Sequence, residues 1–197
     1  MNTTSRKGLW LAVAAVAAVQ TAALAFMVWS RVSLLSHGRE IVMKVVPVDP
    51  RDLFRGEYVV LGYDGLTPLK PELARGGAGK ASLYPGAAIY VTLAPDAEKG
   101  WVPVGFEASY PAQVEPGHAV FKGFVVDRFW STEGLGQPVN VRYGIESYFV
   151  PEGEGLKLEA LVRERKIEAV IALGSDGTAA LKGLLSDGKP ISTQPAL

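Results

Sequence analysis

The chain contains no cysteine among its 197 residues. It therefore forms no disulfide, offers no thiolate nucleophile and has no Cys-based metal site. Histidine is almost as scarce, because His37 and His118 are the only two and lie far apart in the sequence. Two histidines at such a separation do not have the spacing of a metal-ligand set. We therefore predict neither a metal ion nor a cofactor.

An excess of charge of either sign is also missing. The 20 Lys and Arg residues balance the 20 Asp and Glu residues. The first 30 residues hold two basic residues and no acidic one, so the remainder has 18 basic and 20 acidic residues, a net charge of −2. A nucleic-acid-binding surface needs a basic excess. We therefore predict that the protein does not bind nucleic acid.

What the chain does have is one long apolar run near its start. Residues 8–29 are apolar except for Gln20 and Thr21, and a stretch of about 20 such residues is enough to cross a bilayer core. Trp10 and Trp29 lie at the two ends of the run, where membrane interfaces favour indole rings. The run predicts a transmembrane helix, and Gly38 is expected to end it.

A cleavable signal peptide is the alternative interpretation of the same residues. Ala23-Leu24-Ala25 fits the small-residue pattern of a cleavage site. The apolar run continues past that site through residues 26–29, which favours an anchor that is not cleaved. We therefore expect residues 1–36 to form a tail and an anchor, and residues 37–197 to form one domain.

The orientation of this anchor follows from weaker signals. Basic residues are found on both sides of the apolar run, so the positive-inside rule is close to a tie between Arg6 and Lys7 on one side and Arg31, Arg39 and Lys44 on the other. A very short tail before a folded domain favours a cytoplasmic tail. We therefore expect the domain to face the periplasm or the cell exterior.

Beyond the anchor, alternating apolar residues and frequent turn signals predict a mainly β domain. The chain has 22 glycines and 13 prolines, which favour short strands joined by tight connections. One amphipathic helix is expected, at residues 156–165. The architecture that we predict is a mostly antiparallel β-barrel or sandwich with one accessory helix. The expected strands are 41–48, 58–63, 87–94, 101–110, 118–128, 139–143, 146–150, 167–173 and 179–185.

The first candidate site is a charged corner between the first two expected strands. Pro50 and Gly56 favour a bend here rather than a strand. Its arginines have the geometry to grip a carboxylate or phosphate, or they pair with the neighbouring acids and hold the corner closed. Self-pairing is favoured because both signs are present in equal number. The charged residues are Arg51, Asp52, Arg55 and Glu57.

The second candidate site combines acids with tyrosines late in the chain. Glu146 and Tyr148 would share one face of a strand, with Tyr143 before them and Glu152 after them. Such a set can serve as a binding site or supply a general acid. A half-exposed sheet face, with the tyrosine hydroxyls reaching water, is the favoured interpretation.

Both stretches resemble the GDYXXLXY family. The first carries Gly56-Glu57-Tyr58-Val59-Val60-Leu61-Gly62-Tyr63, with Glu57 where the family name has Asp, preceded by Asp49-Pro50-Arg51-Asp52 and Arg55. The second is residues 143–153. The resemblance implies a bacterial protein anchored in the inner membrane, of unknown function, that often accompanies a multi-pass membrane protein. It adds Gly56 and Tyr58 to the candidate binding residues.

Two catalytic interpretations are considered and set aside. An anchor followed by Pro47 and the Gly56 stretch superficially resembles the signal-peptidase family, but Lys44 stands where that family has its nucleophilic serine. The glycines at 76–79 precede Lys80, yet no Ser or Thr follows it as a phosphate-binding loop requires.

We therefore expect a non-enzymatic accessory protein that docks onto a membrane protein or an envelope component. The alternative is an envelope hydrolase or polymer-binding enzyme. It would use Glu146 or Asp52 as acid or base, with the long loop at residues 65–86 as a lid.

Overall fold

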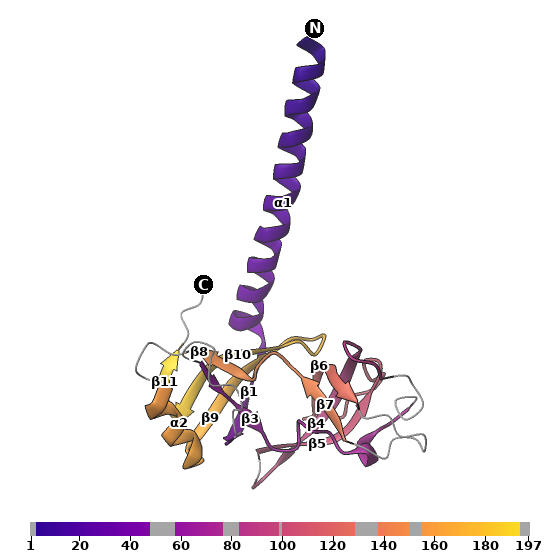
Figure 1. Cartoon of the computed structure of the whole chain (residues 1–197). Helices are drawn as coiled ribbons and strands as arrows, with labels where there is room; N and C mark the ends of the chain where they lie inside the picture. Colours follow the sequence, from indigo (N-terminus) through magenta and orange to yellow (C-terminus); the bar gives the residue numbers. More distant parts are fainter. Residues whose placement is uncertain are drawn as a thin grey trace.

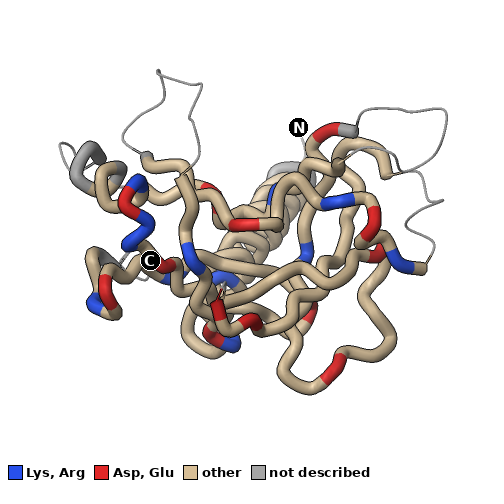
Figure 2. Tube along the Cα trace, turned by 90° about the horizontal axis from the view of Figure 1, so that it is seen from below, with Lys and Arg blue, Asp and Glu red and all other residues tan. Residues whose placement is uncertain are grey.

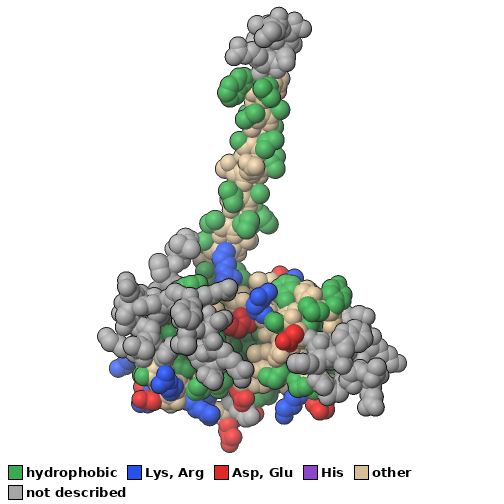
Figure 3. Space-filling view, viewed as in Figure 1, with side chains coloured by type: hydrophobic (Ala, Val, Ile, Leu, Met, Phe, Trp, Pro, Cys, Tyr) green, Lys and Arg blue, Asp and Glu red, His purple; other side chains and the backbone are tan. Residues whose placement is uncertain are grey.

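A computed structural model describes residues 3–47, 58–76, 83–98, 100–128, 138–149 and 155–193. A single long helix, α1 (Thr3–His37), rises from a β-rich body (Figure 1). Its stretch Gly8–His37 is long and apolar enough to cross a membrane, and none of its most apolar window is buried by the protein. Figure 3 shows hydrophobic side chains along this helix, with Lys or Arg side chains gathered at its foot. The expected apolar segment is thus present as one exposed helix that is able to cross a membrane.

The helix ends where the sequence predicts, at the glycine that follows His37. The N–H of Gly38 donates to the carbonyl of Leu34 at 2.8 Å. A Cβ at Gly38 would lie 2.5 Å from that same carbonyl oxygen, so only glycine fits there without a shift. The chain turns at once into the first strand, β1 (Arg39–Val46).

Two sheets form most of the body. The five-stranded sheet has the order β11-β10-β9-β1-β3 and the four-stranded sheet the order β5-β4-β6-β7. Every strand pair registered within the sheets is antiparallel. The strands of the first sheet are β1, β3 (Gly62–Tyr63), β9 (Ile167–Leu173), β10 (Ala179–Ser186) and β11 (Lys189–Thr193). Those of the second are β4 (Ala88–Asp96), β5 (Gly100–Glu107), β6 (Ala119–Arg128) and β7 (Val139–Arg142).

A third pairing, between β2 (Tyr58–Val60) and β8 (Ser147–Phe149), completes the β structure of the described residues. A short 3₁₀ helix, η1 (Pro71–Leu73), and α2 (Gly155–Arg163) are the remaining helices there. The mainly β, antiparallel fold class predicted from the sequence is confirmed. Strand β11 is an addition to the predicted strands, because the sequence pattern indicates only a turn and a tail at residues 186–197.

One hydrophobic core joins the sheets. It forms because alternate residues of each strand point inward, as period-two patterning requires. In β1 the buried residues are Ile41, Met43 and Val45, and in β4 they are Ile89, Val91 and Leu93. The helix α2 contributes Leu158 and Val162, which lie one turn apart and are 4% exposed each.

The long loop after β3 is not a free lid in the part that the structure describes. Leu66 and Leu69 are 1% and 0% exposed, and Leu69 exchanges two backbone hydrogen bonds with Val139 at 2.9 and 3.0 Å. Ala74 forms a bridge with Phe106 of β5. Residues 65–76 are therefore docked on the body, while the part of the expected lid at 77–82 lies outside the described residues.

Candidate functional site

Most of the charged corner lies outside the described residues. This holds for Arg51, Asp52, Arg55, Gly56 and Glu57, and the structure places only the backbone of the next residue, Tyr58, at the start of β2. Self-pairing of the corner charges therefore stays a prediction. Glu152, at the end of the second stretch, is also outside the described residues.

The structure brings the two family-like stretches side by side. The strand β2 pairs with β8 in antiparallel register, with Tyr58 opposite Phe149 and Val60 opposite Ser147. One step further, the N–H of Leu61 donates to the carbonyl of Glu146 at 2.8 Å. The segments at 58–66 and 143–149 thus form one unit, which we call the motif junction.

Two buried tyrosines, one from each stretch, hydrogen-bond across the motif junction. The hydroxyl of Tyr63 donates to the carbonyl of Ile145 at 2.8 Å, and the hydroxyl of Tyr143 donates to the carbonyl of Leu66 at 2.9 Å. Tyr63 is 4% exposed and Tyr143 is 6% exposed. Each stretch therefore supplies one tyrosine that satisfies a buried carbonyl of the other stretch.

Glu146 closes the turn that presents these groups. Its carboxylate accepts a hydrogen bond from the N–H of Tyr143 and another, at 2.8 Å, from the N–H of Gly144. Gly144 has φ of +82°, a left-handed conformation that glycine adopts without strain. Because each oxygen of the carboxylate holds a backbone N–H, Glu146 stabilises a turn, and this is a different task from proton transfer.

This geometry corrects the favoured interpretation of the second candidate site. Glu146 precedes β8 and is half-buried, so it does not share a half-exposed strand face with Tyr148. Tyr148 is itself only 1% exposed. The hydroxyl of Tyr143 bonds protein rather than water. The pattern predicts a strand that begins at Glu146, but β8 begins one residue later, at Ser147, after the turn at Gly144.

The electrostatics of the junction keep its tyrosines neutral. Burial raises the pKa of the Tyr63 hydroxyl far above its ordinary value, and the nearby negative charge of Glu146 raises it further. The same two causes, in the same order, raise the pKa of Tyr143. A phenol with a raised pKa holds its proton more firmly, which suits a structural hydrogen-bond donor.

Packing around Tyr143 leaves no spare room. A Cβ on Gly123 of β6 would overlap Cγ1 of Val141 and lie 2.9 Å from the Tyr143 ring. Phe121 packs against the same ring edge to face, with ring centroids 6.3 Å apart. Glycine at position 123 therefore allows the ring to reach the position from which it bonds Leu66.

Among the described residues, no group of three His, Cys, Asp or Glu side chains is placed to hold a metal ion. In the part of the chain that the structure describes, Lys and Arg are interspersed with Asp and Glu when the body is seen from below (Figure 2).

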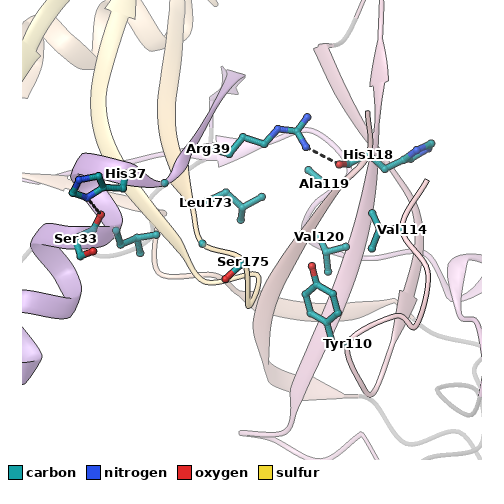
Figure 4. Close-up of a pocket in the computed structure, with 13 residues that line it drawn as sticks. Ser33, His37, Arg39, Tyr110, Val114, His118, Ala119, Val120, Leu173 and Ser175 are labelled. Carbon is teal, nitrogen blue, oxygen red and sulfur yellow. Dashed lines mark hydrogen bonds between the residues drawn. The ribbon is translucent and has the colours of Figure 1, made fainter. Parts of the chain in front are cut away.

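No sequence pattern points to the hollow beside the foot of the helix. A cleft of about 560 Å³ lies between the foot of α1, the turn after β9 and the start of β6 (Figure 4). We call it the juxtamembrane cleft. Residues from three distant parts of the chain meet there, Ser33 to Arg39, Tyr110 to Val120 and Leu173 to Ser175, so no local sequence signal marks it.

Comparison with known proteins gives one family. The model of the GDYXXLXY protein family matches residues 20–184, which is most of the chain and includes both halves of the motif junction. No curated protein and no solved structure matches the chain.

Proposed function

Since the chain belongs to the GDYXXLXY family, we propose that it is a membrane-anchored accessory protein whose body docks onto a multi-pass membrane protein. The observation that carries this proposal is the exposed helix Gly8–His37, of which the most apolar window is 0% buried. An apolar helix of this length needs lipid or another membrane helix around it. The body is joined to its foot by Gly38 alone, which keeps the body at the membrane surface.

We further propose that the body faces the periplasm or the cell exterior, with the anchor in the inner membrane of a bacterium. Arg39 and Lys44 belong to strand β1 of the folded body, and folded domains cross a membrane largely regardless of their charge. Arg6 and Lys7 at one end of the apolar run then outweigh Arg31 at the other end, which supports this orientation.

The arrangement of the motif junction supports an interaction role over catalysis. Tyr63, Tyr143 and Glu146 bond backbone groups of the junction itself. A general acid or base needs a side chain that can reach a substrate proton, and Glu146 has both oxygens engaged. The junction instead gives a rigid base for the segments at 48–57 and 150–154, which leave it at β2 and β8. The charged residues on those segments are the ones that we propose contact the partner, with Arg51, Arg55 and Glu152 foremost.

The experiment that tests this proposal is affinity isolation of the full chain after cross-linking in intact membranes. We expect one multi-pass membrane protein to be enriched with the wild type. The double variant Arg51→Ala/Arg55→Ala should lose it while keeping the circular dichroism spectrum of the wild type. Lys166→Gln is the matched control, because it removes a cation that pairs with Glu164 just after α2 rather than with a residue of the junction.

A chimera separates the contribution of the body from that of the helix. The anchor is replaced by an unrelated membrane helix of equal length, with the body unchanged. If the partner is retained, the body carries the interaction; if it is lost, the docking role of the body is wrong. Failure of the wild type to enrich any membrane protein over the control would refute the accessory role altogether.

A further inference from the structure

The juxtamembrane cleft is built around one arginine that bridges the two sheets. Arg39, the first residue of β1, extends across the cleft toward β6 (Figure 4). Its guanidinium donates to the carbonyl of His118 at 2.9 Å and to that of Gly117 at 3.1 Å. It also lies 5.6 Å from the centroid of the Trp101 ring. A guanidinium has five N–H donors, so these two bonds fix its position and leave donors for a further acceptor.

The position of the cleft along the helix sets its depth relative to a membrane. Residues 8–29 span about 33 Å at about 1.5 Å per residue, close to the roughly 30 Å of a bilayer core. Ser33 then lies about 6 Å beyond the apolar run. The headgroup region of one leaflet is about 5–8 Å thick. The Ser33 end of the cleft is therefore level with lipid headgroups.

An independent contact places the body at the same level. The turn between β9 and β10 approaches the helix, and an ideal Cβ on Gly174 would lie 3.3 Å from the Leu34 side chain. Beside it, Asp176 and Thr178 form a second hollow with Met27, Ser30 and Arg31 of the helix. The body thus packs against the last turns of the apolar segment and is not held away from the bilayer.

The cleft offers hydrogen-bond donors and an apolar wall, a combination that suits an amphiphile. Its donors include Arg39 and the hydroxyls of Ser33, Tyr110 and Ser175, and its apolar side includes Leu34 and Val114. Tyr110 is 43% exposed and Val114 is 37% exposed, so both present surface to an occupant. No Asp or Glu is among the described residues that line it.

Two acids that adjoin cleft residues in the sequence, Glu115 and Asp176, do not line the cleft. The Asp176 carboxylate accepts hydrogen bonds from the N–H of Thr178 at 3.0 Å and from its hydroxyl at 2.7 Å. Glu115 lies 3.6 Å from the His118 ring. Arg39 is the one Lys, Arg, Asp or Glu among the described residues that line the cleft.

We propose that the juxtamembrane cleft binds the phosphate headgroup of a phospholipid from the leaflet on the side of the body. Arg39 donates to a phosphate oxygen through the N–H groups that the carbonyls of Gly117 and His118 leave free, and Tyr110 and Ser175 add hydroxyl donors. The acyl chains lie along the apolar surface of α1 beyond Leu34. This inference goes beyond the docking role and rests on the membrane anchor of the proposed function, because its ligand is a lipid of that membrane.

The test uses the full chain in detergent and native mass spectrometry, with phosphatidylglycerol as the probe. We expect a one-to-one lipid adduct with the wild type. Diacylglycerol, which lacks the phosphate, and inorganic phosphate, which lacks the chains, should bind at least tenfold more weakly. Arg39→Gln should weaken the phosphatidylglycerol adduct by about tenfold or more, the effect of losing one charge-assisted hydrogen bond.

Controls keep a folding defect from being mistaken for lost binding. Arg39 also hydrogen-bonds the residues just before β6, so its loss can destabilise the body. The double variant Tyr110→Phe/Ser175→Ala removes two hydroxyls and keeps those hydrogen bonds. We expect it to weaken the phosphatidylglycerol adduct by about threefold or more. Lys166→Gln removes a cation just before β9. The end of β9 that lies near the helix is Leu173, which pairs with Arg39, whereas Glu168 at the other end pairs with Lys44. Lys166 is therefore remote from the cleft. This variant should bind as the wild type does.

Three outcomes would overturn the proposal. The first is an adduct of equal strength with diacylglycerol or with inorganic phosphate. The second is a double variant that is folded and binds phosphatidylglycerol unchanged. The third is a cross-linked protein loop that occupies the cleft in membranes and excludes the lipid.

Discussion

Replacement of Glu146 tests whether its carboxylate has a structural role or a catalytic one. In the structure this side chain receives the N–H groups of Tyr143 and Gly144. Glu146→Ala would leave both groups without their acceptor, next to the tyrosine that bonds Leu66. We expect the variant to loosen the motif junction and to lower the free energy of unfolding of the body.

The expected size follows from the two lost bonds. A hydrogen bond to a charged group contributes about 1.5–3 kcal/mol. Glu146 is half-buried, so water replaces part of that contribution. The loss should therefore be about 2–4 kcal/mol, or roughly 5–15 °C in Tm for a body of this size. Glu146→Gln keeps one acceptor oxygen and should lose about half as much.

The measurement is urea unfolding of the full chain in mild detergent, followed by near-ultraviolet circular dichroism. The matched control is Glu115→Ala, whose side chain is 82% exposed and which should stay within about 0.5 kcal/mol of the wild type. The structural reasoning is refuted if Glu146→Ala unfolds at the wild-type urea concentration. It is also refuted if that variant keeps its stability and loses turnover of an envelope substrate.

Three further predictions concern the tyrosines, the packing and the anchor. Because burial raises the folded-state pKa of Tyr63 and Tyr143, stability should be intact below pH about 10 and fall as the pH rises, by about 1.4 kcal/mol per tyrosine at pH about 11. Urea midpoints measured from pH about 8 to about 11 should show this fall in stability. In Tyr63→Phe the fall should be half as large, and a fall equal to that of the wild type contradicts the burial argument. Gly123→Ala should lower the free energy of unfolding by about 1–3 kcal/mol, since its Cβ would overlap Val141 and Tyr143. Gly144→Ala places its Cβ in open space at φ of +82° and should lower it by only about 1 kcal/mol. Thermal melts of the two variants measure this difference. The mature protein should resist carbonate extraction and keep residues 8–29, as intact mass will reveal, and a soluble form beginning after Ala25 would contradict the anchor.

Several features of this protein follow from local sequence patterns. A continuous apolar run is enough to predict a membrane helix, because the bilayer core imposes its length on any segment that crosses it. Alternation with period two is enough to predict strands such as β1 and β9, because successive side chains point to opposite faces. The end of the helix at Gly38 is predictable for a similarly local reason. The mainly β body and the apolar helix before it could therefore be predicted without coordinates.

The candidate site was predictable only in part. The residues of both stretches stand out in the sequence, yet their roles depend on partners that lie far away along the chain. In the sequence Tyr143 has the pattern of a surface residue, but in the fold its hydroxyl bonds the carbonyl of Leu66. Glu146 likewise has the pattern of a free acid, but in the fold it accepts two backbone N–H groups at the turn of Gly144. Strand β11 escapes prediction because its signal is short and its pairing with β10 is interrupted by a register shift.

Composition and period alone were enough to indicate a long apolar helix followed by a β body, since both properties belong to contiguous residues. The pairing of β2 with β8, the burial of Tyr63 and Tyr143, and the cleft that Arg39 crosses at the foot of the helix came to light only in three dimensions. The physical reason is that hydrogen bonds and burial are properties of pairs in space, and pairs distant in sequence leave no periodic trace in a single chain.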